Sequence, residues 1–141
     1  EAAKAVEKSQ QSIADKINGV AKALPCLQKA AKYQKYLAKA GMDFENISQI
    51  KDKIFEEINE VLGASNSNLE MECGDLLFAV VNLLRFLGVD GEVALNKACA
   101  KFAGRVVIVE QKCEKKGVAL GDLTAAEQDN LWQEAKKNEN R

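Results

Sequence analysis

The hydrophobic positions of this 141-residue chain recur at helical spacing along most of its length. In the stretch 44–62, apolar side chains fall on one arc when each residue turns the helix by about 100°, which is typical of an amphipathic helix. The stretch 67–87 is apolar nearly all round from Leu76 onwards, and its polar interruptions there are Asn82 and Arg85. A helix with this pattern is expected to be enclosed by others. The pattern therefore predicts an all-α protein.

Capping and helix-breaking residues define the expected boundaries. A weakly amphipathic stretch at 13–24 is followed by expected helices at 25–41, 44–62, 67–87, 90–116 and 124–137. Asp43 can cap the helix that follows it. Ser67 with Glu70 matches a capping box, and Thr124 with Glu127 matches a second one. We expect a bundle of about five helices around a central antiparallel hairpin, completed by oligomerisation.

Composition agrees with one helical domain over residues 12–141. The chain contains one proline and nine glycines and is 47% apolar, which favours helices over strands and allows one compact core. The polar, alanine-rich segment 1–11 has no face to bury, and we expect it to be disordered. The net charge of -1 gives no general attraction for nucleic acid, and the apolar runs are too short to span a membrane. Four cysteines without Cys-x-x-Cys spacing and the lack of a signal-peptide core predict reduced thiols in a cytoplasmic protein.

Acidic residues stand at close helical spacing on both helices of the expected hairpin. Glu57 falls at the edge of the apolar arc of the first helix, and Glu60 and Glu56 lie progressively further out. Glu72 and Asp75 share one face of the second helix, where its apolar segment begins. The short link GASNSN predicts an antiparallel hairpin, which would bring all of these carboxylates except that of Glu56 together.

Converging carboxylates require a compensating charge. At about 5 Å and an effective dielectric constant of about 20, each like-charged pair costs about 3 kcal/mol. The local cations Lys51, Lys53 and Arg85 are too few to balance the group. A divalent cation would suffice, and oxygen ligands in a chain without histidine favour Mg²⁺, or secondarily Mn²⁺, over zinc or a di-iron site. Either acidic motif alone is explained as an ordinary charged helix face or as a first turn favoured by the helix dipole.

The two acidic motifs together resemble a known family. Glu56-Glu57-x-x-Glu60 followed by Glu72-x-x-Asp75 is similar to the Glu-Glu-x-x-Glu…Glu-x-x-Asp motif of the MazG nucleoside triphosphate pyrophosphohydrolases, in the all-α NTP pyrophosphatase superfamily. The likeness covers about residues 24–136 and includes the blocks LPCLQKAAKYQKYLAKAGMDF, DKIFEEINEV, GDLLFAVVNLLRFLGVD and ALNKACAKF. It is closest to the catalytic C-terminal half of long bacterial MazG proteins.

The resemblance implies Mg²⁺-dependent hydrolysis of nucleoside triphosphates to the monophosphate and pyrophosphate. It implies that the metal ligands are Glu57, Glu60, Glu72 and Asp75. Glu56 would lie in the outer shell or orient water, so that Glu56, Glu57 and Glu60 are the catalytic candidates. It further implies a homodimer or higher oligomer and a role in clearing damaged or surplus nucleotides, and no nucleic acid or membrane partner is expected.

Two further pairs match nucleotide-contacting positions of the family. Lys101 and Arg105 are four residues apart, as are Trp132 and Lys136, so each pair shares a helix face. The resemblance implies that the cations bind phosphate oxygens and that the indole stacks on the base. Taken without the resemblance, the first pair is a solvated stripe, and Trp132 is a packing residue of the last helix.

Two positions depart from the family pattern. Val106 stands where an aromatic residue is common and Phe44 where tryptophan is usual, so the resemblance leaves the base preference open. The alternative to the enzyme is a non-catalytic helical interaction module that retains the fold. The complete set of carboxylates favours the enzyme, and the charge balance disfavours a nucleic-acid-binding bundle.

Overall fold

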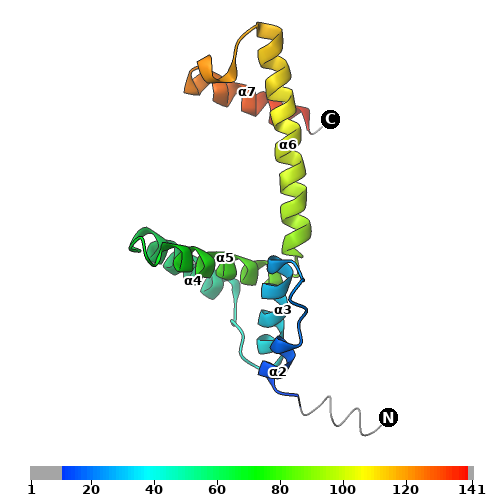
Figure 1. The fold of residues 1–141 in the computed structure, drawn as a ribbon, viewed down its shortest axis with the longest axis vertical. Coiled ribbons are helices and arrows are strands. Elements are labelled where there is room, and N and C mark those ends of the chain that lie inside the picture. The colour runs from blue at the N-terminus through cyan, green and yellow to red at the C-terminus, as the bar shows by residue number, and fades with distance from the viewer. Residues whose placement is uncertain (1–10, 140–141) are drawn as a thin grey trace, which may run out of the picture. The chain divides into compact units, whose positions relative to one another are not determined.

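A computed structural model describes residues 11–139, and every regular element within them is a helix (Figure 1). The elements in chain order are α2 (Ile13–Asn18), α3 (Cys26–Lys39), α4 (Ile47–Leu62), α5 (Leu69–Phe86), α6 (Gly91–Lys116), the short 3-10 helix η1 (Leu120–Asp122) and α7 (Ala125–Asn138). The predicted all-α fold is thereby confirmed. None of the helices that the structure describes is long and apolar enough to cross a membrane.

The chain divides into two compact units, and the boundary falls between Glu92 and Val93. The expectation of a single domain over 12–141 stays a prediction. The expected disordered segment 1–11 lies, except for Gln11, outside the described residues.

The expected helix boundaries are close to those observed, apart from the first helix. That helix, α2, stops at Asn18 instead of Leu24, and Gly19 is its C-cap. The capping box formed by Thr124 and Glu127 is confirmed at the start of α7.

The expected capping box of α5 is wrong. The helix begins after Asn68, whose side chain makes no capping hydrogen bond. The Ser67 hydroxyl instead lies 3.1 Å from that of Ser65, so it is engaged within the link before the helix. A serine that bonds within its own turn is a common competitor of capping.

The expected cap of α4 is also wrong, because Asp43 has another partner. Asn46 caps the helix, and its side chain accepts a hydrogen bond of 3.0 Å from the backbone N–H of Gln49. Asp43 accepts two hydrogen bonds of 2.7 and 3.0 Å from Arg85 of α5. A bidentate guanidinium is a stronger partner for a carboxylate than neutral N–H groups, which explains the exchange of roles.

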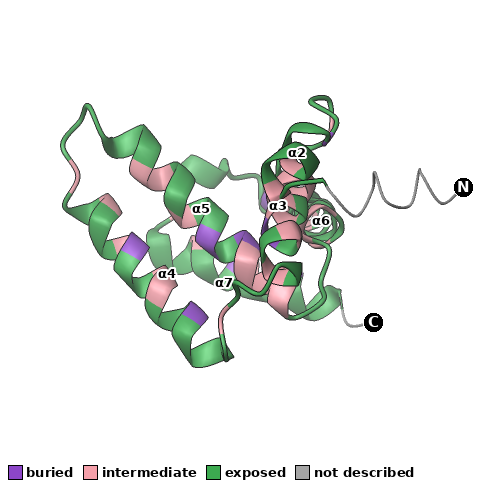
Figure 2. Ribbon diagram, turned by 90° about the horizontal axis from the view of Figure 1, so that it is seen from below, coloured by how far each residue is buried: buried purple, intermediate pink, exposed green. Residues whose placement is uncertain are grey.

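In the first unit, α4 and α5 lie side by side as the expected antiparallel hairpin (Figures 1 and 2). Ile50 of α4 is 1% exposed and is the most deeply buried large side chain of the described residues. Glu57 is the other buried residue of α4, while Ala79 and Val81 are those of α5. The same helix face that buries Ile50 therefore carries a carboxylate into the hairpin.

The other helices of the first unit form a layer that reaches α5 through α3. α3 packs against α5, and α2 packs against α3. The side-chain Nε2 of Gln34 in α3 donates a hydrogen bond of 2.9 Å to the backbone carbonyl of Phe78 in α5. This bond ties α3 to the helix that carries Glu72 and Asp75.

Within the described chain, α5 is only partly enclosed, and its expected enclosure by a second copy stays a prediction. Leu77 is 61% exposed and Phe78 is 46% exposed, and the green segments of α5 in Figure 2 show this open side. α3 and α4 cover only part of an apolar surface that extends nearly all round the helix, because two neighbours cannot surround a third.

The second unit has a small core between the C-terminal part of α6 and α7. It consists of Val109, Cys113, Leu131 and Ala135, against which Ile108, Leu123 and Trp132 pack. An ion pair of 2.6 Å between Lys112 and Glu134 links the same two helices. All four cysteines of the chain are free thiols, as expected, although Cys26 and Cys99 are exposed.

Replacing Ile50 with alanine is expected to lower the free energy of unfolding by about 2–5 kcal/mol, because it removes apolar contacts and leaves a cavity under the hairpin. Ile50→Val, which removes one methyl group, is the matched control and should cost about 0.5–1.5 kcal/mol. Urea denaturation followed by circular dichroism measures both changes. Equal and small losses in the two variants would show that the hairpin does not depend on this side chain.

Candidate functional site

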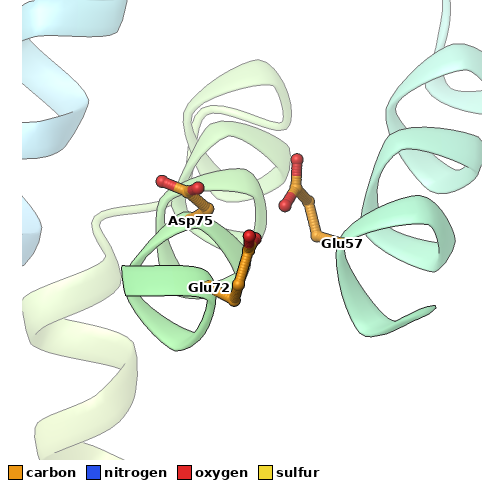
Figure 3. A group of neighbouring side chains, drawn as sticks. All are labelled: Glu57, Glu72 and Asp75. Carbon is orange, nitrogen blue, oxygen red and sulfur yellow. The ribbon is translucent and has the colours of Figure 1, made fainter. Parts of the chain in front are cut away.

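Three carboxylates meet across the α4–α5 hairpin (Figure 3). Glu57 projects from α4, and Glu72 and Asp75 project from α5. One oxygen atom of each lies within 4.8 Å of those of the other two. Glu57 is buried, Glu72 is half-buried and Asp75 is exposed, so the group opens to solvent on the α5 side. We call these three residues the acidic group.

Local helix geometry explains why the sequence places these side chains together. Glu72 and Asp75 are three residues apart and so lie on the same face of α5. Glu72 is also in the first turn of α5, where the helix dipole favours an anion. The antiparallel hairpin then places the second half of α4, with Glu57, beside the first half of α5.

The other two predicted carboxylates lie outside the acidic group. Glu60 is exposed, but its charge contributes to raising the pKa of Glu72, which places it at the rim of the group. Glu56 is exposed and pairs with Lys53 at 3.4 Å. The structure therefore brings three of the four predicted metal ligands together, and the catalytic roles of Glu56, Glu57 and Glu60 stay predictions.

Lys53 balances part of the negative charge. Its Nζ lies 3.1 Å from Oε1 of Glu57, one helical turn away, and 3.4 Å from Oε1 of Glu56. The hydrogen bond with Glu57 is the largest cause of the raised pKa of Lys53. One of the few local cations thus reaches the acidic group, although a single positive charge does not balance three carboxylates.

Glu72 is a member of the acidic group whose pKa is raised. Its pKa is raised above the ordinary value by desolvation, and next by the negative charges of Glu60, Asp75 and Glu57. A carboxylate whose pKa is raised on folding binds its proton more tightly in the folded state, so it lowers stability once it is ionised. A cation among these oxygens would relieve the repulsion.

The acidic group fits a hard divalent cation. Carboxylate oxygens are the ligands that Mg²⁺ and Mn²⁺ prefer. Ligands at about 2.1 Å from an ion lie at most about 4 Å apart, so oxygens already within 4.8 Å need only small side-chain rotations to share one ion. The set is compatible with the expected metal, although the geometry does not select between the two ions.

A cavity of about 270 Å³ opens beside the acidic group. Its lining consists of Phe44, Ile50, Lys53, Glu57, Asp75, Phe78, Ala79 and Asn82. Sequence reasoning did not assign Asn82 to the site and noted it only as an interruption of an apolar helix. That interruption was the available signal, because a polar residue in an otherwise apolar helix needs a partner or a ligand.

The predicted substrate-binding residues lie in the second unit. Lys101 and Lys136 are exposed. Arg105 donates two hydrogen bonds to the Glu139 carboxylate, one of them at 2.8 Å from its terminal nitrogen. Its guanidinium carbon also lies 5.8 Å from the centre of the Trp132 ring. Arg105 is therefore already engaged, whereas the two lysines present their ammonium groups to solvent.

Trp132 is half-buried against the core of the second unit. Its ring centre lies 5.3 Å from that of Phe102, with the two planes at 54°. These contacts agree with Trp132 as a packing residue. Its proposed stacking on a nucleobase stays a prediction.

The region that contains the acidic group matches a known family. Residues 45–108, which include the whole of α4 and α5, match the family model described as "MazG nucleotide pyrophosphohydrolase domain". The chain carries a MazG domain. The resemblance noted from the acidic motifs is thereby confirmed, and the all-helical structure is consistent with the all-α fold of MazG proteins.

Curated relatives of the MazG domain come from several bacteria. The chain is 35% identical over 142 residues to the nucleoside triphosphate pyrophosphohydrolase of Escherichia coli (strain K12), covering 96% of this chain and 54% of that protein. It is 38% identical over 134 residues to the nucleoside triphosphate pyrophosphohydrolase/pyrophosphatase MazG of Thermotoga maritima, covering 94% and 52%. It is 40% identical over 130 residues to the uncharacterized protein YabN of Bacillus subtilis (strain 168), covering 89% and 27%. The chain thus spans about half the length of the first two relatives.

The raised pKa of Glu72 predicts how the stability of the metal-free protein depends on pH. Glu72→Gln should raise the melting temperature at neutral pH, because it removes a charge that desolvation and its neighbours disfavour. The gain should shrink as the pH falls through the raised pKa, where the wild-type carboxyl is protonated and also neutral. Thermal melts in EDTA over a series of pH values measure the difference.

Glu70→Gln is the matched control, since Glu70 is an exposed carboxylate on the first turn of the same helix. It should give no gain, because it removes a charge that the helix dipole favours. A Glu72→Gln protein that is less stable than the wild type at neutral pH would contradict the repulsion within the acidic group.

Proposed function

We propose that this protein hydrolyses nucleoside triphosphates to the nucleoside monophosphate and pyrophosphate in the presence of Mg²⁺. The observation that carries the proposal is the convergence of Glu57, Glu72 and Asp75 within a MazG domain. Relatives from E. coli and T. maritima are named for this activity. A function in clearing damaged or surplus nucleotides and a cytoplasmic location stay predictions.

The acidic group would hold Mg²⁺, or Mn²⁺, with Glu60 joining it from the rim. When bound, the ion neutralises triphosphate charge and acidifies a water molecule. In the reaction, the water oxygen forms a bond to phosphorus while the P–O–P bridge between the α- and β-phosphates breaks and its oxygen leaves with the departing group. One of the candidates Glu56, Glu57 and Glu60 accepts the proton of the water.

Cations of the second unit are proposed to bind the phosphates. Lys101 and Lys136 are exposed and suit phosphate oxygens as charge-assisted donors. Arg105 would take part by exchanging the Glu139 carboxylate for a phosphate, which presents the same kind of paired oxygen atoms.

Asp75→Asn and Glu60→Gln are expected to fold normally and to lower kcat/KM at least about 100-fold, because each removes a charge from the metal set, and metal stabilisation of the transition state amounts to several kcal/mol. Asp52→Asn, at an exposed position of α4 outside the acidic group, is the matched control and should keep wild-type activity. Turnover is measured on a panel of standard and modified triphosphates with Mg²⁺ or Mn²⁺, and the products are identified. Wild-type activity in Asp75→Asn would refute the metal assignment.

The same panel decides between the enzyme and the alternative of a non-catalytic interaction module. Hydrolysis of at least one triphosphate to the monophosphate and pyrophosphate establishes the enzyme. Failure of the folded wild-type protein on every triphosphate with both metals would favour the module, whose acidic group would then serve a purpose other than turnover.

We further propose that the chain forms a homodimer or a larger homo-oligomer. Leu77 is 61% exposed on α5 and Phe55 is 56% exposed on α4, so the hairpin presents large apolar side chains to solvent. Apolar patches of this kind mark interaction surfaces, and a second copy can cover its own equivalent by two-fold symmetry.

Light scattering at micromolar concentration should show a dimer or larger species for the wild type. Leu77→Glu should shift it to the monomer, because it places a charge in the proposed contact. Leu95→Glu, at an exposed apolar position of α6 that is not part of the hairpin, is the matched control. A stable, active wild-type monomer would contradict the proposal.

A further inference from the structure

We infer that the nucleoside part of the substrate binds in the cavity beside the acidic group, between Phe44 and Phe78, with the amide of Asn82 as a polar contact. We call this cavity the nucleoside slot. The inference rests on the proposed triphosphate hydrolysis and adds the place where the base is distinguished. All the residues that form the slot belong to the first unit.

The slot shares three of its lining residues with a larger cavity. Glu57 and Asp75 line the slot of about 270 Å³, which shares Phe44, Phe78 and Asn82 with a cavity of about 660 Å³. The larger cavity lies in the range typical of small-molecule sites and is also lined by Tyr33, Leu37 and Met42. Phosphates bound at the acidic group would therefore leave the attached nucleoside next to these apolar walls.

Two aromatic rings suit a nucleobase. Phe78 is 46% exposed, so its ring is available to a ligand, and Phe44 is half-buried on the other shared wall. Stacking on aromatic side chains is favourable for every base, since each has a π-face. A purely apolar partner would need neither the carboxylates nor the amide that open onto the same space.

The side chain of Asn82 is held in one orientation. Nε of Arg85 donates a hydrogen bond of 2.8 Å to Oδ1 of Asn82, while the other two guanidinium nitrogens bind Asp43. A guanidinium has only donors, so it fixes the amide oxygen on its own side and leaves the NH₂ group of Asn82 for another partner. Within residues 11–139 the structure records no acceptor for that NH₂ group. Hydrogen bonds from Arg85 also lower the pKa of Asp43, which keeps this chain of contacts charged at neutral pH.

Gln34, which lines the larger cavity, carries a buried acceptor that complements this donor. Gln34 is 7% exposed, and its Nε2 is committed to the backbone carbonyl of Phe78. Its Oε1 is buried and has no hydrogen-bond partner among the described residues. Buried polar atoms are rarely left in this state, and an amino or imino group on a base edge would supply the missing donor. Asn82 and Gln34 thus offer one donor and one acceptor, which is the chemistry needed to read a base.

The alternative to the nucleoside slot is base recognition by Trp132. Its ring already packs against Phe102 and the core of the second unit. The two assignments differ in their consequences, because only residues that touch the base change the ranking of substrates by base.

The test measures kcat/KM of Asn82→Ala and Phe78→Leu on purine and pyrimidine triphosphates. Loss of one hydrogen bond in Asn82→Ala should lower kcat/KM about 3- to 10-fold on the preferred base and flatten the ranking. Loss of the stacked ring in Phe78→Leu should cost about tenfold or more on every base. Asn59→Ala, at an exposed asparagine of α4, is the control for loss of an amide and should leave the ranking unchanged.

Inorganic tripolyphosphate, which has no nucleoside, separates the slot from the metal centre. Its inhibition constant in the presence of Mg²⁺ should be the same for the wild type, Asn82→Ala and Phe78→Leu. An equal loss of affinity for tripolyphosphate and for nucleotides would show that the variants act through the acidic group, and would overturn the inference. An unchanged ranking in both variants, together with a changed ranking in Trp132→Ala, would overturn it as well.

Asp43→Asn tests the positioning of Asn82. This substitution keeps the size of the side chain but weakens its ion pair with Arg85. It should therefore flatten the base ranking in the same direction as Asn82→Ala. The inhibition constant of tripolyphosphate should not change. A variant that loses stability but keeps the wild-type ranking would show that the ion pair has only a structural role.

A direct binding measurement tests the nucleoside slot independently of turnover. Calorimetry with nucleoside monophosphates should show weaker binding to Phe78→Leu than to the wild type, whether or not the protein hydrolyses triphosphates. If the wild type hydrolyses none, the proposed function fails and this measurement alone decides the slot. Equal binding to both proteins, or no binding to the wild type, would overturn the inference.

Discussion

Mutual repulsion of three carboxylates, held within 4.8 Å of one another, is the constraint on which the first unit depends. The apolar contact of α4 with α5, together with the deeply buried Ile50, supplies the free energy that keeps them together. Because the two helices are rigid and their link is short, the backbone positions that carry the three carboxylates cannot move apart without unfolding the hairpin. Carboxylates that repel one another when no cation is bound are thereby preorganised to bind one.

The fold class and the acidic group were predictable because they depend on local regularities. Helical periodicity acts over a few residues, and the link between α4 and α5 is too short to allow anything but an antiparallel hairpin. From these two facts the meeting of Glu57 with Glu72 and Asp75 follows without further information. Helical periodicity alone does not decide whether Glu60 joins the acidic group, because a side chain at the edge of a helix face turns inward or outward according to its contacts.

Contacts between distant parts of the chain were the ones that sequence reasoning missed. The position of Asp43 in the sequence is typical of a helix cap. Only the packing of α5 shows that its carboxylate binds Arg85 instead of capping α4. The orientation of Asn82 depends on that ion pair and so was equally hidden. The cover of α5 is another long-range feature, since an apolar helix predicts that it will be covered but does not say by which chain.

Lys53 gives the acidic group a resident monovalent counterion. When the carboxylates hold no ion, its ammonium neutralises part of the charge on Glu57 from one helical turn away. A divalent ion that binds Glu57 must compete with this ammonium, so part of the electrostatic gain is offset by the lost ion pair. The lysine would consequently act as an internal competitor that weakens capture of such an ion and eases its release. The charge that stabilises the empty hairpin would then also set the metal concentration at which the acidic group fills.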